Sequence, residues 1–81
     1  MYTNEMRSAV KMLDHYRPKG FGVTIVDNDH FLTVKAPEKE FFLLSDRDKR
    51  LAVEYMVKIK KALEQNGAIV LLVREGGVEN G

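Results

Sequence analysis

The segment from Ser45 to Glu75 constrains the fold more than any other part of the chain. Its first part repeats apolar residues with the period of a helix and ends at Asn66-Gly67, a pair typical of a left-handed helix terminus. An unbroken apolar run, Ala68 to Val73, follows at once. Such a strand is typical of the inside of a sheet, because both of its faces are apolar. We therefore expect a neighbour along each edge, most simply the first strand or a symmetry mate.

Two shorter elements precede this segment. Thr3 is placed to cap a first helix that runs to about Tyr16, where Arg17-Pro18 forces the backbone out of the helical region. Residues 40–44, a glutamate followed by four apolar residues, predict a short third strand or an extended entry into the long helix. Ser45 then caps the long helix in a capping-box pattern with an aspartate in the glutamate position.

A hairpin is predicted between the first helix and residues 40–44. Residues 21–26 and 30–36 flank a turn of aspartate and asparagine, which tolerate left-handed backbone. With Asn28-Asp29 as a two-residue loop, the apolar residues sort cleanly onto faces. The resulting pairs are Ile25–Leu32 and Val23–Val34 on one face, and Val26–Phe31 and Thr24–Thr33 on the other.

Together these elements predict an α+β fold, a two-layer sandwich with the order α-β-β-β-α-β. A four-stranded mixed sheet would carry two helices on one face. Residues 1–75 would form a single globular domain, and residues 76–81 a flexible C-terminal tail.

Length and composition limit the class of protein. A chain of 81 residues forms one domain with a core that just suffices, since it buries roughly 60–65% of its unfolded surface. No apolar run approaches the roughly 18 residues that cross a bilayer, and the polar N-terminus does not resemble a signal peptide. The absence of cysteine excludes disulfides and thiolate chemistry. We therefore expect a cytoplasmic protein that contacts no membrane.

Side chains suited to catalysis or metal binding are few. Asp27, Asp29 and His30 form the densest cluster of metal-capable groups, but their turn lacks the glycine and glutamate of a calcium loop. A plain hairpin turn explains these residues better. A metal-binding or catalytic turn at residues 27–30 is therefore the least favoured of three functional hypotheses. The histidines lack an evident serine and carboxylate partner, and no glycine pattern suits a phosphate loop. We expect no enzyme activity, catalytic residue, cofactor, metal or small-molecule substrate.

The long helix carries an alternative hypothesis of nucleic-acid binding. The chain has a net charge of +1, whereas nucleic-acid-binding domains usually carry a large basic excess. Acidic residues alternate with the basic ones, and a solvated face with a Glu54–Lys58 ion pair explains the pattern as well. The residues that would contact phosphate in this alternative are Arg47, Arg50, Lys58 and Lys61.

Apolar residues that neither helix covers predict a protein interaction. Val57 lies outside the apolar arc of the long helix, and alternate residues of each strand must face away from the helices. An exposed apolar sheet face usually marks a partner. The leading hypothesis is a non-enzymatic interaction module that binds another protein or forms a homodimer. Its expected interaction face consists of Val26, Phe31, Val70, Leu72 and Val57.

Three segments resemble small uncharacterised accessory proteins of actinobacterial phages. They are FGVTIV (21–26), SDRDKRLAVEYM (45–56) and AIVLLVRE (68–75). The resemblance spans most of the chain and contains no catalytic motif. It implies a protein in the cytoplasm of a bacterial host that binds a host or phage macromolecule, and it assigns no functional residue.

Overall fold

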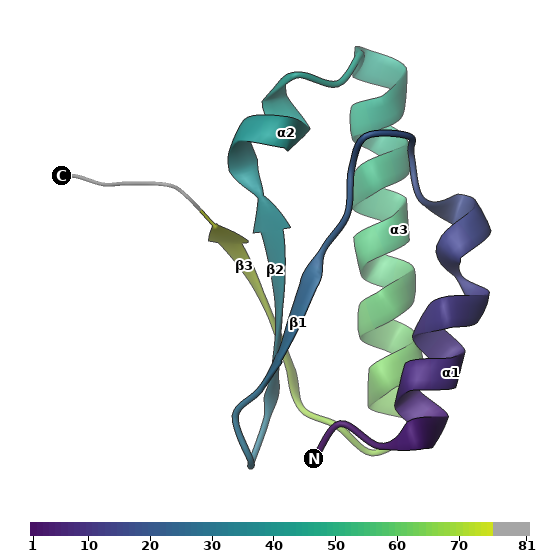
Figure 1. Ribbon diagram of the computed structural model, residues 1–81, viewed down its shortest axis with the longest axis vertical. Coiled ribbons are helices and arrows are strands. Elements are labelled where there is room, and N and C mark those ends of the chain that lie inside the picture. The colour runs from purple at the N-terminus through teal and green to yellow at the C-terminus, as the bar shows by residue number, and fades with distance from the viewer. Residues whose placement is uncertain (76–81) are drawn as a thin grey trace, which may run out of the picture.

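A computed structural model describes residues 1–75 as a three-stranded sheet with the two longer helices on one side of it (Figure 1). The elements in chain order are α1 (Asn4–Met12), η1, a 3-10 turn (Asp14–Tyr16), β1 (Thr24–Asp27), β2 (Leu32–Pro37), α2 (Glu38–Phe42), α3 (Asp46–Gln65) and β3 (Val70–Glu75). The α+β class is confirmed, but the prediction of four strands is wrong. The predicted C-terminal tail lies outside the described residues.

β2 is the central strand of the sheet. It pairs antiparallel with β1 and parallel with β3, so the strand order is β1-β2-β3. β3 therefore lies at an edge, with β2 along one side and no second neighbour within residues 1–75. The expectation that this strand lies beside the first strand is wrong, because β2 occupies that place.

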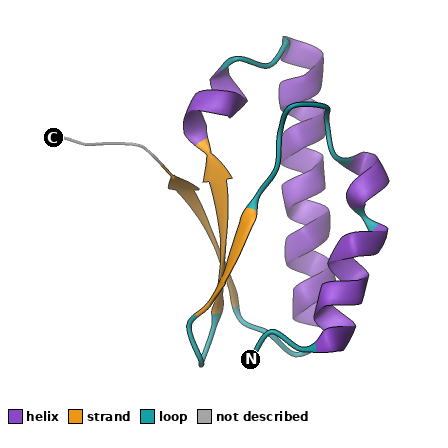
Figure 2. Cartoon of the chain, viewed as in Figure 1, coloured by secondary structure: helices purple, strands orange, loops and turns teal. Residues whose placement is uncertain are grey.

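The two faces of the sheet differ in what covers them. Leu32 and Val34 of β2 are fully buried beneath the helices, and the parallel register places Leu72 beside Val34 on that same face. Alternate residues point to the opposite face, where Thr33 lies next to Leu71. Figure 2 shows α1 and α3 together on one side of the strands, so the sheet has a helical face and an open face.

The hairpin has a longer turn than predicted. Asp27 pairs with Leu32 and Val26 with Thr33, so four residues, 28–31, form the connection. Asp29 adopts a left-handed φ of 71°, and its N–H donates to the Asp27 carboxylate at 3.0 Å. These local bonds stabilise a wider turn, which shifts the register by two residues. The same residues still share each face, but Val26 no longer lies opposite Phe31.

α2 replaces the predicted third strand. A strand would place Phe41 and Leu43 on one face, whereas one helical turn directs Phe41 and Leu44 to the same side. Phe41 and Leu44 pack against the core, and Leu43 is 81% exposed. Pro37 precedes the helix, and Glu38 lies in its first turn, where a negative charge is favourable. Residues 40–44 therefore follow the helical period and not the strand period.

α3 begins and ends where the sequence predicts. The Ser45 hydroxyl accepts a hydrogen bond from the Asp48 N–H at 3.1 Å, and Gly67 ends the helix with φ 93°. The Ala68 N–H donates to the Leu63 carbonyl at 3.1 Å, which turns the chain directly into β3. α1 is shorter than predicted, because the chain tightens into η1 before Arg17-Pro18. The largest core residues are Phe21, Met6, Leu32, Ile59, Leu63 and Val34.

Candidate interaction surface

The edge strand β3 exposes apolar side chains on both faces of the sheet. Leu71 and Val73 on the open face are 50% and 40% exposed, and Leu72 on the helical face is 44% exposed. Ile69, just before the strand, is 67% exposed. Long apolar edges are rare in soluble proteins, because they template pairing with another chain. The β3 edge is therefore the most unusual surface of the described residues.

The backbone groups along this edge have a defined orientation. The Leu32 N–H donates to the Ile69 carbonyl at 2.8 Å, so the polar groups of Ile69 point toward β2. Orientation alternates along a strand, so those of Val70, Leu72 and Arg74 point outward. Within residues 1–75 no strand accepts or donates to them. The edge thus presents a ladder of free donors and acceptors.

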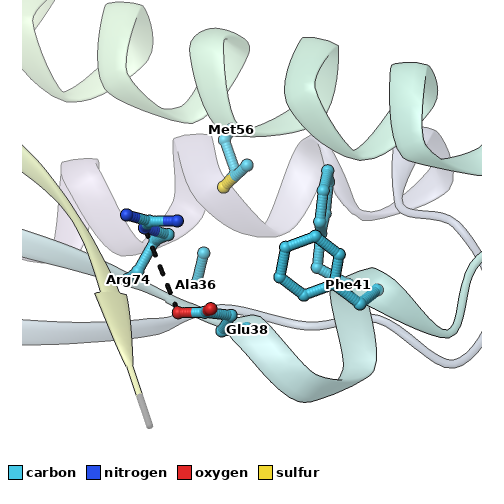
Figure 3. A pocket seen from close by; sticks show the side chains of 6 residues that line it. Ala36, Glu38, Phe41, Met56 and Arg74 are labelled. Atoms are coloured by element: carbon cyan, nitrogen blue, oxygen red, sulfur yellow. Dashed lines mark ion pairs between the residues drawn. The ribbon is translucent and has the colours of Figure 1, made fainter. Parts of the chain in front are cut away.

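Two valines of α3 extend the apolar surface. Val53 and Val57 lie one turn apart and are 47% and 40% exposed. The opposite flank of α3 faces the N-terminal part of the chain, where the Lys58 Nζ lies 4.6 Å from the centre of the Tyr16 ring. Met56, between the buried side of α3 and Val53, points toward the β3 residue Arg74 (Figure 3). Val53 and Val57 therefore lie on the flank of α3 turned away from α1.

A small pocket lies where α2, α3 and the strand ends meet (Figure 3). Its volume is about 160 Å³, and Ala36, Phe41 and Met56 form its apolar lining. Arg74 Nε lies 4.0 Å from Glu38 Oε1 at its rim. Pockets for small molecules usually enclose about 300–1,000 Å³, so this one is below the usual size. We assign no ligand to it.

The structure does not gather the five residues predicted to share an interaction face. Val26 lies on the open face of β1, and Phe31 lies in the neighbouring turn. Val70 is only 6% exposed beneath the helices. Leu72 shares the helical face with Val70 but is exposed, and Val57 lies on α3. Leu72 and Val57 therefore belong to the surface around the β3 edge, and the other three do not.

Sequence reasoning missed Leu71, Val73 and Ile69 as surface residues. The unbroken apolar run predicts an interior strand, and Val70 and Leu72 are predicted to lie on the exposed face in place of those three residues. A signal was present in β2, where Leu32, Val34 and Ala36 alternate with polar residues. That alternation indicates one helical face, and a strand paired in parallel with β2 must divide its own residues in the same way.

The basic residues of the nucleic-acid alternative all point outward. Arg47, Arg50, Lys58 and Lys61 are exposed along the side of α3 opposite its buried residues. The expected Glu54–Lys58 ion pair is absent from residues 1–75, because Lys58 extends over Tyr16 instead. The ion pair that α3 does form joins Lys60 Nζ to Glu64 Oε2 at 2.6 Å.

The turn at residues 27–30 uses its polar groups to hold the backbone. The Asp27 carboxylate accepts hydrogen bonds from the N-terminal ammonium group and from the N–H groups of Asp29 and Tyr2. These bonds lower the pKa of Asp27 to about 2, and the bond from the ammonium group contributes most. The Asn28 side chain donates to the Thr33 hydroxyl at 2.7 Å. Within residues 1–75 no three histidine, aspartate or glutamate residues are grouped to hold a metal ion.

Asp14 and Tyr55, on the α1 side of α3, also have shifted pKa values. The hydrogen bond from Arg17 Nε at 2.8 Å lowers the pKa of Asp14, and burial raises the pKa of Tyr55. Neither group lies at the β3 edge, where residues 70–73 are all apolar.

Comparison with known proteins adds no assignment. No protein family, curated protein or solved structure matches the chain. Across residues 1–75 no helix has both the length and the apolar character that a membrane span requires. The resemblance to phage accessory proteins therefore stays a prediction.

Proposed function

We propose that this protein is a non-enzymatic interaction module that binds a protein partner along the free edge of β3. The observation that carries the proposal is the exposed apolar edge, with Leu71 and Val73 on one face and Leu72 on the other. The partner would be an extended segment that adds a strand to the sheet. Outward-pointing backbone groups would give it affinity, and the leucine and valine side chains would select its alternate residues.

The composition of β3 supports this proposal. Proteins that keep an edge free of partners usually place lysine, proline or a bulge along it. β3 carries no such residue from Val70 to Val73, and its first charge is Arg74. An apolar edge of this length is costly to expose unless a partner covers it.

The proposal is tested by selecting, from a display library of random peptides, those that bind the wild-type protein. We expect selected peptides to show alternating apolar residues and to bind the Leu71→Lys variant at least tenfold more weakly. Leu43→Lys is the matched control, because Leu43 is a more exposed leucine in the connection between α2 and α3. Peptides that bind both variants as well as the wild type would place the binding surface elsewhere and contradict the proposal.

Nucleic-acid binding along α3 is a second candidate function. Four exposed basic residues lie along the outward side of this helix, with acidic residues such as Glu54 among them, and their alignment favours contact with phosphate. Anisotropy of labelled oligonucleotides would then fall steeply as salt rises, because bound counterions are released on binding. The Arg47→Gln/Lys61→Gln double variant should show a smaller slope of log affinity against log salt concentration. No binding at low salt would remove this candidate.

A further inference from the structure

We infer that the partner at the β3 edge is a second copy of this chain, paired antiparallel through β3 about a two-fold axis near Leu72. The inference rests on the proposed function, since it needs the β3 edge to be a binding surface. It adds the identity of the partner, the strand direction and the register. Pairing of this kind would join two three-stranded sheets into one continuous sheet.

The charges of β3 favour antiparallel pairing. Arg74 and Glu75 lie together at the C-terminal end, and the rest of the strand is apolar. Parallel self-pairing would place each charge beside its own copy, and like charges directly opposite destabilise a sheet. Antiparallel pairing separates the charges to the two ends of the interface. It also sets the apolar centre of one strand against that of the other.

The outward backbone groups specify the register. Only residues whose N–H and C=O point away from β2 can exchange hydrogen bonds with a new strand, and these are Val70, Leu72 and Arg74. The symmetric arrangement pairs Leu72 with Leu72 of the second copy, and Val70 with Arg74 of the second copy. On the open face, Leu71 then lies opposite Val73 of the second copy. Leu71 and Val73 of both copies, four exposed apolar side chains in all, then lie next to one another.

The placement of α3 is compatible with this axis, because α3 lies on the helical face of the sheet and packs against β3 (Figure 2). A two-fold axis perpendicular to the sheet keeps that face on the same side in both copies. The two α3 helices would then lie on one face of the joined sheet, together with Leu72 of each copy.

The extent of the exposed surface distinguishes a second copy from a bare peptide. A stable interface buries about 800 Å² of each partner, and one strand edge provides only part of that area. A peptide would cover β3 and leave Val53 and Val57 in solvent. A second copy would cover these valines with its own α3, because they lie on the flank turned away from α1. A second copy would therefore cover both the β3 edge and the two exposed valines of α3.

Disulfide trapping tests the register, because the chain contains no cysteine. We expect Leu72→Cys to form a covalent dimer on mild oxidation, since the two Cα atoms would lie about 5.5 Å apart. Arg74→Cys is the matched control on the same face. Its Cα atoms would lie about 14 Å apart in the dimer, beyond the roughly 7 Å limit for a disulfide. Equal trapping of both variants, or none with Leu72→Cys, would overturn the inferred register.

Sedimentation over a concentration series tests the dimer itself. We expect a dimer for the wild type and Leu43→Lys, and a monomer for Leu71→Lys. Ile69→Lys should keep or strengthen the dimer, because residue 69 would lie opposite Glu75 of the second copy. Loss of the dimer in Ile69→Lys would contradict the inferred register, even if Leu71→Lys does not fold.

The outcomes separate this inference from the proposed function. A wild-type monomer at every concentration overturns the inference, while peptide binding that Leu71→Lys weakens still upholds the interaction module. A monomer without such peptide binding overturns both. A dimer that Leu71→Lys leaves intact shows self-association through another surface, and overturns the inference as well.

Discussion

Asp27 accepts hydrogen bonds from three donors at the base of the hairpin turn. Two of them belong to residues 1 and 2, so this one carboxylate ties the N-terminal segment to the end of β1. The pKa of Asp27 is lowered to about 2 because the bonds favour its charged form. The stabilisation is complete above the unfolded-state pKa of about 3.9 and is lost as pH falls toward 2.

We therefore predict that the Asp27 carboxyl titrates near pH 2, and that Asp27→Asn reduces the loss of thermal stability between pH 4 and pH 2. NMR of the side-chain carboxyl carbon measures the midpoint, and melting curves measure the stability. Asp29→Asn is the matched control in the same turn, since asparagine tolerates the left-handed backbone at that position. An Asp27 midpoint near 4 would show that the bonds do not hold in solution.

Gly67 is required at the junction of α3 and β3 because of its φ of 93°. A side chain there strains the left-handed backbone, although a Cβ would meet no atom within 4 Å. We predict that Gly67→Ala lowers the free energy of unfolding by about 1 kcal/mol in urea titrations. Gly22→Ala, also in open space but without a positive φ, should be neutral or slightly stabilising. Equal losses at both glycines would contradict the assigned backbone strain.

At the scale of elements, the short helix α2 shows where local pattern becomes ambiguous. Four consecutive apolar residues, 41–44, satisfy a strand or a helical turn, because a run this short has no resolvable period. The choice depends on which side chains reach the core. Phe41 lies 6.2 Å from Phe21, ring centre to ring centre, at a steep angle, and this tertiary contact is not encoded in the local pattern of residues 41–44.

Alanine substitutions through α2 test its helical period. We predict that Phe41→Ala and Leu44→Ala each lower the free energy of unfolding by about 1–3 kcal/mol, because both residues pack on the core. Phe42→Ala and Leu43→Ala should change it by about 0.5 kcal/mol or less, because both are exposed. Chemical denaturation of the four variants gives the comparison. Losses that group Phe41 with Leu43 would indicate a strand.

The elements that sequence predicted well are those with local causes. The Ser45 cap, the helical period of α3 and the stop at Gly67 each depend on residues a few positions apart, and all are confirmed. The strand order depends on which distant segment pairs with β3, and its composition suits an interior or an edge position equally. For the same reason the candidate surface was predicted only in part. Val57 and Leu72 were identified, whereas Leu71 and Val73 required knowledge of the sheet edge.

At the scale of the whole molecule, the three-stranded sheet leaves much of its apolar surface to be covered. A domain of this size has a thin stability margin, since its core is small relative to its surface. The inferred pairing through β3 would double the sheet and bring Leu71, Leu72 and Val73 into contact with side chains of the second copy. Association would then contribute to folding stability, because a partner that binds the folded state shifts the unfolding equilibrium.

We predict that the melting temperature of the wild type rises with protein concentration. A tenfold increase raises the free energy of unfolding of a dimer by about 1.4 kcal/mol, or about 0.7 kcal/mol per chain, which corresponds to about 3–5 °C for a domain of this length. Leu71→Lys should melt at a lower temperature that does not change with concentration, because the charge blocks pairing while the core remains intact. Leu43→Lys should behave as the wild type. Scanning calorimetry over two decades of concentration measures all three, and a wild-type midpoint that stays constant would show that the fold does not depend on association.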